Sequence, residues 1–126
     1  MKLLKKIALA LCIAATMGTV PTSVMAADGR IVYAPADAID MVAAKVGIAI
    51  DALTKGEDAD KVSELIKDVL AASKEINASD KVFAARDKIH SKLKAARTHL
   101  KEGAGQEAEQ ELRDAQKAFL ALKSIL

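Results

Sequence analysis

Four stretches of the chain repeat apolar side chains every three or four residues, and this spacing constrains the fold more than any other feature. At 3.6 residues per turn, such a repeat places the apolar side chains on one face of an α-helix. The last stripe alternates steps of four and three, which is typical of helices that pack almost antiparallel. No segment alternates with the period of two expected of a half-buried strand, so the sequence predicts an all-α protein. The stripes consist of Ile39, Val42, Ala43, Val46, Ile50 and Leu53; Val62, Leu65, Ile66, Val69, Ala72 and Ile76; Val82, Ala85, Ile89, Leu93, Ala96 and Leu100; and Ala108, Leu112, Ala115, Phe119, Leu122 and Leu126.

Short connections separate the four stripes. Gly56 suits the left-handed position that ends a helix, Asn77 to Ser79 suit a turn, and Gly103 to Gly105 interrupt the helical pattern again. Connections of a few residues force neighbouring helices to run antiparallel. The sequence therefore predicts an antiparallel up-down four-helix bundle, built from two helical hairpins, over residues 37–126. Residues 27–36 are expected to form an extended lead-in.

The first 26 residues have the pattern of a cleaved signal peptide. Three lysines occur among the first six residues, and the apolar run from Ile7 to Ala15 follows them. This run is shorter than the roughly 20 residues of a membrane-spanning helix, and Ala26 suits a cleavage site before Ala27. A lipoprotein anchor at Cys12 is disfavoured because a leucine precedes the cysteine. The short, lysine-led pattern indicates a bacterial protein that is periplasmic or secreted, with no transmembrane segment in the mature chain.

Cleavage would change the composition on which functional inferences depend. The whole chain has 126 residues, 19 basic and 17 acidic, with a net charge of +2. Without the three lysines of the signal peptide, 16 basic residues face 17 acidic ones, so the net charge falls to about −1. The single cysteine is lost as well, which excludes a disulfide scaffold. The remaining 100 residues are enough for one domain.

A weak internal repeat relates the two predicted hairpins. The motif of Lys45, Ala49, Leu53 and Gly56 recurs 47 positions later as Lys92, Ala96, Leu100 and Gly103, and Glu64-Leu65 recurs as Glu111-Leu112. Duplication of a hairpin explains this match. The common pattern of any helix that ends in glycine explains it equally well.

This layout of two glycine-hinged hairpins behind an export signal resembles the small periplasmic metal-binding proteins that form four-helix bundles. The resemblance covers roughly residues 37–126 and concerns the layout rather than a motif. Those proteins are rich in histidine, whereas this chain has only His90 and His99, so their metal function does not carry over by residue. The layout is also similar to that of soluble periplasmic b-type cytochromes. Met41 matches a possible haem ligand, but the last helix has no histidine opposite it, and no cofactor is expected.

The histidines offer at most a weak metal site. Nine residues separate His90 from His99, which places them on opposite sides of a helix and about 13 Å apart along it. Asp87 precedes His90 by three residues, so these two side chains are the candidate metal ligands. A carboxylate-bridged site in a bundle needs further ligands from other helices, so an exposed histidine on a helix flank is the competing interpretation. The carboxylates Glu107, Glu111 and Asp114 are expected to be solvated.

One helix carries a patterned stripe of basic residues. Its members are spaced by four, four, three and four residues, which aligns them on one flank of the third helix: Arg86, His90, Lys94, Arg97 and Lys101. Such a stripe could form a surface for an anion or an acidic partner. Alternatively, it could face the acidic starts of the second and fourth helices, with Arg97 and Lys101 near Glu107 and Glu111.

The sequence favours a binding protein over an enzyme. It lacks a nucleophile with an adjacent base, and its charge and few aromatic residues disfavour nucleic-acid binding. We therefore expect a non-enzymatic exported interaction module, for example an envelope-stress or accessory protein. The alternative is a small periplasmic carrier of a metal ion or an apolar ligand. The alanine-rich helix faces supply little core volume, so self-association as a dimer or binding of a protein partner is also expected.

Overall fold

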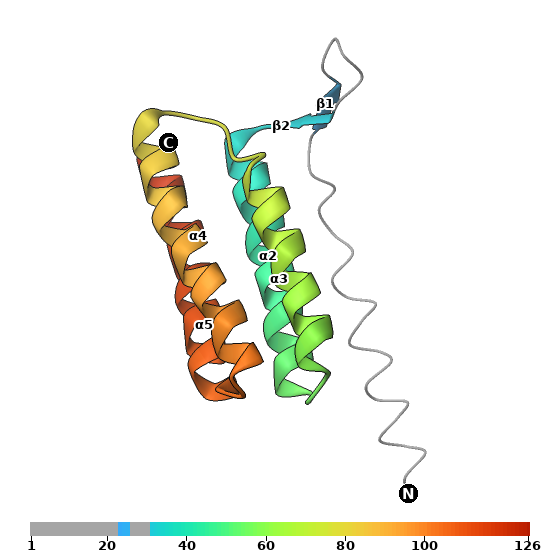
Figure 1. Cartoon of the computed structure of the whole chain (residues 1–126). Helices are drawn as coiled ribbons and strands as arrows, with labels where there is room; N and C mark the ends of the chain where they lie inside the picture. Colours follow the sequence, from blue (N-terminus) through green and yellow to red (C-terminus); the bar gives the residue numbers. More distant parts are fainter. Residues whose placement is uncertain (1–22, 26–30) are drawn as a thin grey trace, which may run out of the picture.

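The computed structural model of the chain describes residues 23–25 and 31–126. Four α-helices pack against one another, which confirms the all-α, four-helix prediction (Figure 1). Apart from Ser23–Met25, the predicted signal peptide lies outside the described residues, as does the predicted cleavage point. The helices are α2 (Pro35–Thr54), α3 (Ala59–Ser73), α4 (Asp80–Lys101) and α5 (Gly105–Ala121), and the short 3₁₀ helix η2 (Leu122–Ile125) follows them. Within the described residues, no helix is both long and apolar enough to cross a membrane.

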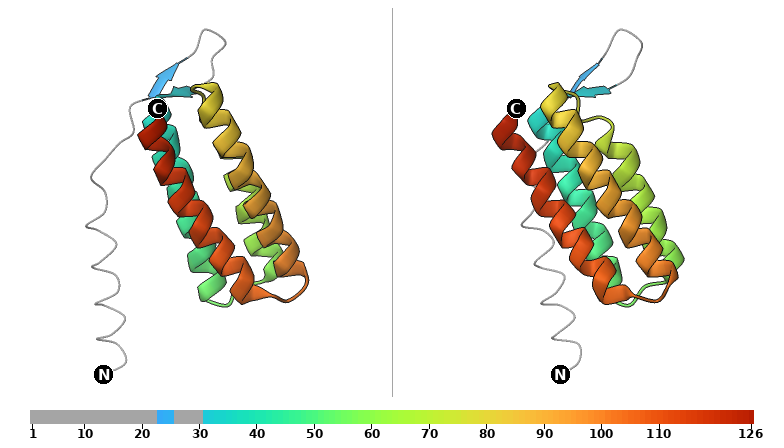
Figure 2. Two further views of the ribbon diagram at one scale, coloured as in Figure 1. Left: turned by 90° about the vertical axis from the view of Figure 1, so that its left-hand side faces the viewer. Right: turned by 60° about the vertical axis from the view of Figure 1, so that its left-hand side comes forward.

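The helices form two hairpins that pack side by side. α2 packs against α3 and α5, and α4 packs against α5 and α3, so each helix has two neighbours (Figure 2). The two glycine-containing connections lie at one end of the bundle. The α3–α4 connection and the C-terminus lie at the other end (Figure 1). α3 and α4 belong to different hairpins and pack against each other. We call the contact between them the α3–α4 seam.

Glycine ends the first helix of each hairpin in the same way. Gly56 and Gly103 have φ angles of 79° and 76°, a left-handed conformation that costs other residues about 1–2 kcal/mol. The amides of Gly56 and Glu57 donate to the carbonyls of Leu53 and Ala52, at 3.1 Å each. This pair of bonds is a Schellman motif, and the same pair follows Gly103. The motif satisfies the last carbonyls of each helix and turns the chain back.

The predicted stripes supply the core. Most of their members are buried, and Phe119 is the largest fully buried side chain. Leu126 is an exception, with 53% of its surface exposed, so the prediction that it points inward was wrong. The α-helix stops at Ala121 and tightens into η2, which rotates the last residues away from the heptad positions. The remaining exceptions are half-buried and pack against the core: Leu53, Leu65, Ala72 and Ala85.

A short β-pair precedes the bundle. Strand β1 (Ser23–Met25) runs antiparallel to β2 (Ile31–Tyr33), with Val24 opposite Val32. α2 then begins at Pro35, where the missing amide proton of proline costs no hydrogen bond. The predicted cleavage before residue 27 falls between the two strands, so cleavage there would separate β2 from β1.

The two hairpins correspond closely in their pattern of burial. Their first helices match at an offset of 47, as in the pairs Val42 with Ile89 and Val46 with Leu93. Their second helices match at an offset of 46, because the second connection is one residue shorter, so the sequence match of Glu64-Leu65 with Glu111-Leu112 is one residue out of register. The buried pairs of the second helices are Val62 with Ala108, Ile66 with Leu112, Val69 with Ala115, Ser73 with Phe119, and Ile76 with Leu122.

Candidate functional site

The basic stripe of α4 lies along the α3–α4 seam. Arg97 and His90 both reach across the seam to serines of α3. The Nε of Arg97 donates to the hydroxyl of Ser63 at 3.0 Å, and Nε2 of His90 lies 2.5 Å from the hydroxyl of Ser73. Both serines are buried, Ser73 completely. The seam is therefore closed by polar contacts on the flank of an otherwise apolar interface.

The hydrogen bonds of Ser73 show that Nε2 of His90 carries a proton. The Ser73 hydroxyl donates its one proton to the carbonyl oxygen of Leu70 at 2.7 Å, so it must accept from Nε2–H of His90. Partial burial holds the pKa of His90 below its usual value, and the nearby cations Arg86, Lys94 and Lys74 act in the same direction, while Asp87 opposes them. His90 is therefore a neutral hydrogen-bond donor at pH 7.

Arg86 occupies the end of the seam near the α3–α4 connection. Its Nη1 donates to the carbonyl oxygen of Ile76 at 3.2 Å, and its guanidinium lies 4.8 Å from the centre of the Phe83 ring. The side chain is 17% exposed, and its Nε has no hydrogen-bond partner within the described part of the chain. The carboxylate of Asp87 is 4.0 Å from this nitrogen and is mostly in solvent. The guanidinium of Arg86 thus contacts a carbonyl oxygen and an aromatic ring, and within the described residues it makes no hydrogen bond to a carboxylate.

The five members of the stripe therefore form a partly fixed basic surface, which we call the α4 basic face: Arg86, His90, Lys94, Arg97 and Lys101. The first, second and fourth are half-buried against α3, and Lys94 and Lys101 are exposed. Among the residues that the structure describes, none of the five is hydrogen-bonded to a carboxylate. Glu111, one of the acidic neighbours expected for Arg97 and Lys101, bonds to His99 instead.

Elsewhere in the described residues, four lysine or arginine side chains pair with surface carboxylates. Four ion pairs of this kind join side chains on the outside of the bundle: Glu57 with Lys61, Glu64 with Lys67, Glu109 with Arg113, and Asp40 with Lys123. In these pairs each positive charge is compensated locally. Arg86, His90 and Arg97 of the α4 basic face instead hydrogen-bond to hydroxyl and carbonyl oxygens, and the carboxylate of Asp87 lies 4.0 Å from Arg86.

The weak metal candidates Asp87 and His90 do not form a cluster. Nε2 of His90 is occupied by Ser73, and the Asp87 side chain is 72% exposed beside Arg86. Within residues 23–25 and 31–126, no group of three or more histidine, cysteine, aspartate or glutamate side chains is placed to hold a metal ion.

His99 forms a contact that the sequence reasoning missed. Its Nδ1 lies 2.8 Å from Oε2 of Glu111 and so joins α4 to α5. The hydrogen bond to Glu111 raises the pKa of His99 above its usual value, and the charges of Glu102 and Glu107 add to this effect. The signal was a histidine one turn before the Gly103 hinge and a glutamate two turns after it, which an antiparallel hairpin brings side by side.

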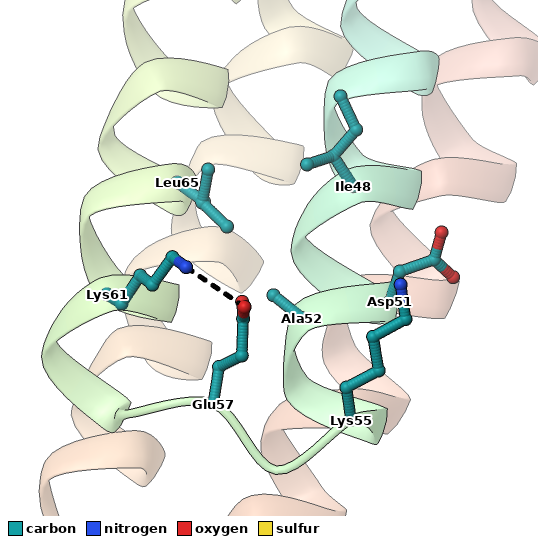
Figure 3. A pocket seen from close by; sticks show the side chains of 7 residues that line it. All are labelled: Ile48, Asp51, Ala52, Lys55, Glu57, Lys61 and Leu65. Atoms are coloured by element: carbon teal, nitrogen blue, oxygen red, sulfur yellow. Dashed lines mark hydrogen bonds and ion pairs between the residues drawn. The ribbon is translucent and has the colours of Figure 1, made fainter.

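The outer side of the first hairpin contains a hollow of about 330 Å³ between α2 and α3 (Figure 3). This hollow could not be predicted from the sequence, because Ile48 lies off the apolar stripe. The hollow is lined by Ile48, Asp51, Ala52, Lys55, Glu57, Lys61 and Leu65.

Comparison with known proteins gives no assignment. No protein-family model, curated protein or solved structure matches the chain.

Proposed function

We propose that the protein is a non-enzymatic, exported interaction module that binds an acidic surface of a partner protein through the α4 basic face. The observation that carries this proposal is the set of five basic side chains on one flank of α4, none hydrogen-bonded to a carboxylate among the described residues. The export part of the proposal rests on the N-terminal pattern of lysines, apolar residues and a small residue at position 26.

Electrostatics favours an acidic partner on this face. After removal of the leader, the net charge is about −1, so the positive charge on α4 is local rather than a property of the whole molecule. A local patch of one sign orients a complementary partner during association and disfavours other orientations. A flank of a rigid helix also presents its charges at fixed spacing.

The half-buried members of the face have a second role in this proposal. Arg97 and His90 are held in place by Ser63 and Ser73, so they lose little conformational freedom when a partner binds. Lys94 and Lys101 are exposed between and beyond them and are free to pair with carboxylates. The face combines side chains held in place with exposed lysines that can adapt to the partner.

Charge reversal tests the proposal with a matched control on the same helix. Lys94→Glu with Lys101→Glu should weaken binding of a poly-glutamate peptide roughly tenfold, since two pairs of up to about 1 kcal/mol are replaced by repulsion. The control is Lys88→Glu with Lys92→Glu, which makes the same charge change on the opposite flank of α4, about 120–160° around the helix from Lys94. Isothermal titration calorimetry at low salt measures both.

The expected result is a loss of affinity in the first variant and a much smaller change in the control. Equal losses in both variants would show that only net charge matters and would contradict a specific face. Circular dichroism should show the same helical content in both variants, because all four lysines are exposed.

A further inference from the structure

We propose that the hollow on the outer side of the first hairpin is the contact surface for a second copy of this chain. The proposal concerns a different face from the α4 basic face, and it does not depend on the function proposed above. α3 contributes to both faces, since it packs against α2 on one side and against α4 on the other.

The centre of the hollow is apolar and open. Ile48 of α2 is 55% exposed, and Leu65 of α3 is half-buried beside it. Figure 3 shows these two side chains at the hollow, with Ala52 between the helices below them. An isoleucine exposed to this extent gains roughly 1 kcal/mol or more when a partner removes it from water.

The second hairpin shows how the same place can be closed. At the offsets of 47 and 46, Ala52 corresponds to His99 and Leu65 corresponds to Glu111. In the second hairpin these two positions form the ion pair that bridges α4 and α5. In the first hairpin a methyl group and a leucine stand in their place, and the seam stays hollow. The two hairpins therefore differ here in these side chains and in the length of the connection.

The charges around the hollow identify the partner. Its rim carries two carboxylates, Asp51 and Glu57, and two ammonium groups, Lys55 and Lys61, of which Glu57 and Lys61 pair with each other at 2.9 Å. A rim with equal numbers of both signs gains little from a strongly charged partner. In a two-fold symmetric dimer the same patch faces itself, so Asp51 of each copy can lie opposite Lys55 of the other copy. The rim is thus complementary to itself, and a second copy is the partner that matches both its charge and its apolar centre.

This arrangement has a consequence for binding. A dimer formed through the outer α2–α3 seam leaves the α4 basic face of each copy uncovered. Two identical faces on one particle allow two contacts with a repetitive or dimeric acidic partner, which increases its apparent affinity without any new contact.

Sedimentation velocity over a range of concentrations tests the contact. The protein is expressed from its full sequence, so that any N-terminal processing occurs before purification. The wild-type protein should show a reversible monomer–dimer equilibrium. Ile48→Asp should weaken dimerisation at least tenfold. Leu120→Asp is the matched control, because Leu120 is also exposed, at 45%, but lies on α5 away from the hollow. It should leave the dimer unchanged.

A charge-exchange experiment tests the symmetry of the contact. One variant carries Asp51→Lys, and the other carries Lys55→Glu. Each variant alone should remain monomeric, because its rim repels itself, whereas an equimolar mixture should restore the dimer. Circular dichroism confirms that the variants are folded.

Three outcomes would overturn the proposal: a wild-type protein that stays monomeric at millimolar concentration, a dimer that tolerates Ile48→Asp, or a mixture of the charge variants that fails to pair. None of these outcomes bears on the α4 basic face, whose lysines lie outside the hollow.

Discussion

Ser73 is fully buried on α3. Its counterpart in the second hairpin, 46 residues later, is the fully buried Phe119 of α5. A buried hydroxyl is tolerated only when it is hydrogen-bonded, and Ser73 bonds both the Leu70 carbonyl and His90. The serine therefore fills less of the core than the phenylalanine does, but it makes a hydrogen bond to the α4 basic face. Because the imidazole is held by this one hydroxyl, the position of His90 depends on a residue in the neighbouring helix.

Replacing this serine should destabilise the fold measurably. Ser73→Ala removes the acceptor of His90 Nε2–H, and we expect the free energy of unfolding to fall by about 1–2 kcal/mol. Ser124→Ala is the control, because the Ser124 hydroxyl also bonds a backbone carbonyl but is exposed, and its change should stay within about 0.5 kcal/mol. Urea denaturation measures both. Equal effects would show that the buried contact with His90 contributes nothing.

The two histidines should titrate in a defined order. The pKa of His99 is raised by Glu111, and the pKa of His90 is lowered by burial and nearby cations, so His99 should titrate at the higher pH. Glu111→Gln should move the titration of His99 down towards the usual value of about 6.5, while Glu109→Gln should not. Imidazole NMR shifts measured against pH report both. The reverse order would contradict the two contacts.

The pKa shifts of His99 and His90 have opposite effects on how the free energy of unfolding changes with pH. His99 binds its proton more tightly in the folded state, so its contribution is fully present below about pH 6.5 and is lost as the pH rises through its folded pKa. His90 binds its proton less tightly when folded, so its contribution is present above about pH 6.5 and is lost as the pH falls below it. The two effects oppose each other in wild-type protein.

At the scale of the helices, the glycine that ends α4 sets the hairpin. Gly103→Ala should lower the free energy of unfolding by about 1–2 kcal/mol, because its φ of 76° is left-handed. Gly105→Ala is the control two residues later. There φ is not positive, and an added methyl would lie 4.0 Å from Leu53, so the change should be neutral or stabilising. Thermal unfolding followed by circular dichroism compares the two. A Gly103→Ala protein as stable as wild type would contradict the hinge.

The helices and their buried faces could be predicted from the sequence because periodicity acts within one element. The sequence could not show where the last helix would tighten, so Leu126 was wrongly assigned to the core. It also could not show which helix would lie beside the α4 stripe. Ser63 and Ser73 look like surface residues in the sequence, and their burial depends on the packing of α3 against α4. The hollow near Ile48 likewise depends on two helices at once.

At the scale of the whole molecule, the faces of the bundle differ in chemistry. The outer seam of the second hairpin is closed by His99 and Glu111. The outer seam of the first is a hollow with an apolar centre and a charged rim, and the α3–α4 seam carries the basic face. Four helices with similar burial thus present distinct surfaces. The proposed function follows from this difference between faces rather than from the fold, which many unrelated functions share.

The binding of an acidic partner should also depend on salt. Exposed charges are screened over about 8 Å at physiological ionic strength, so affinity for poly-glutamate should fall as sodium chloride is raised. The fall should be steeper for wild type than for the variant with Lys94→Glu and Lys101→Glu. Calorimetric titration at several salt concentrations provides the comparison. The same slope for both proteins would mean that these two lysines take no part in binding.

The most direct test of the central claim is an NMR titration of the ¹⁵N-labelled protein with the poly-glutamate peptide. The account predicts that backbone and side-chain shifts concentrate on α4 and the facing side of α3, with the arginine Nε signals of Arg86 and Arg97 among those that move. Shifts spread evenly over all helices, or gathered on the flank that carries Lys88 and Lys92, would contradict it.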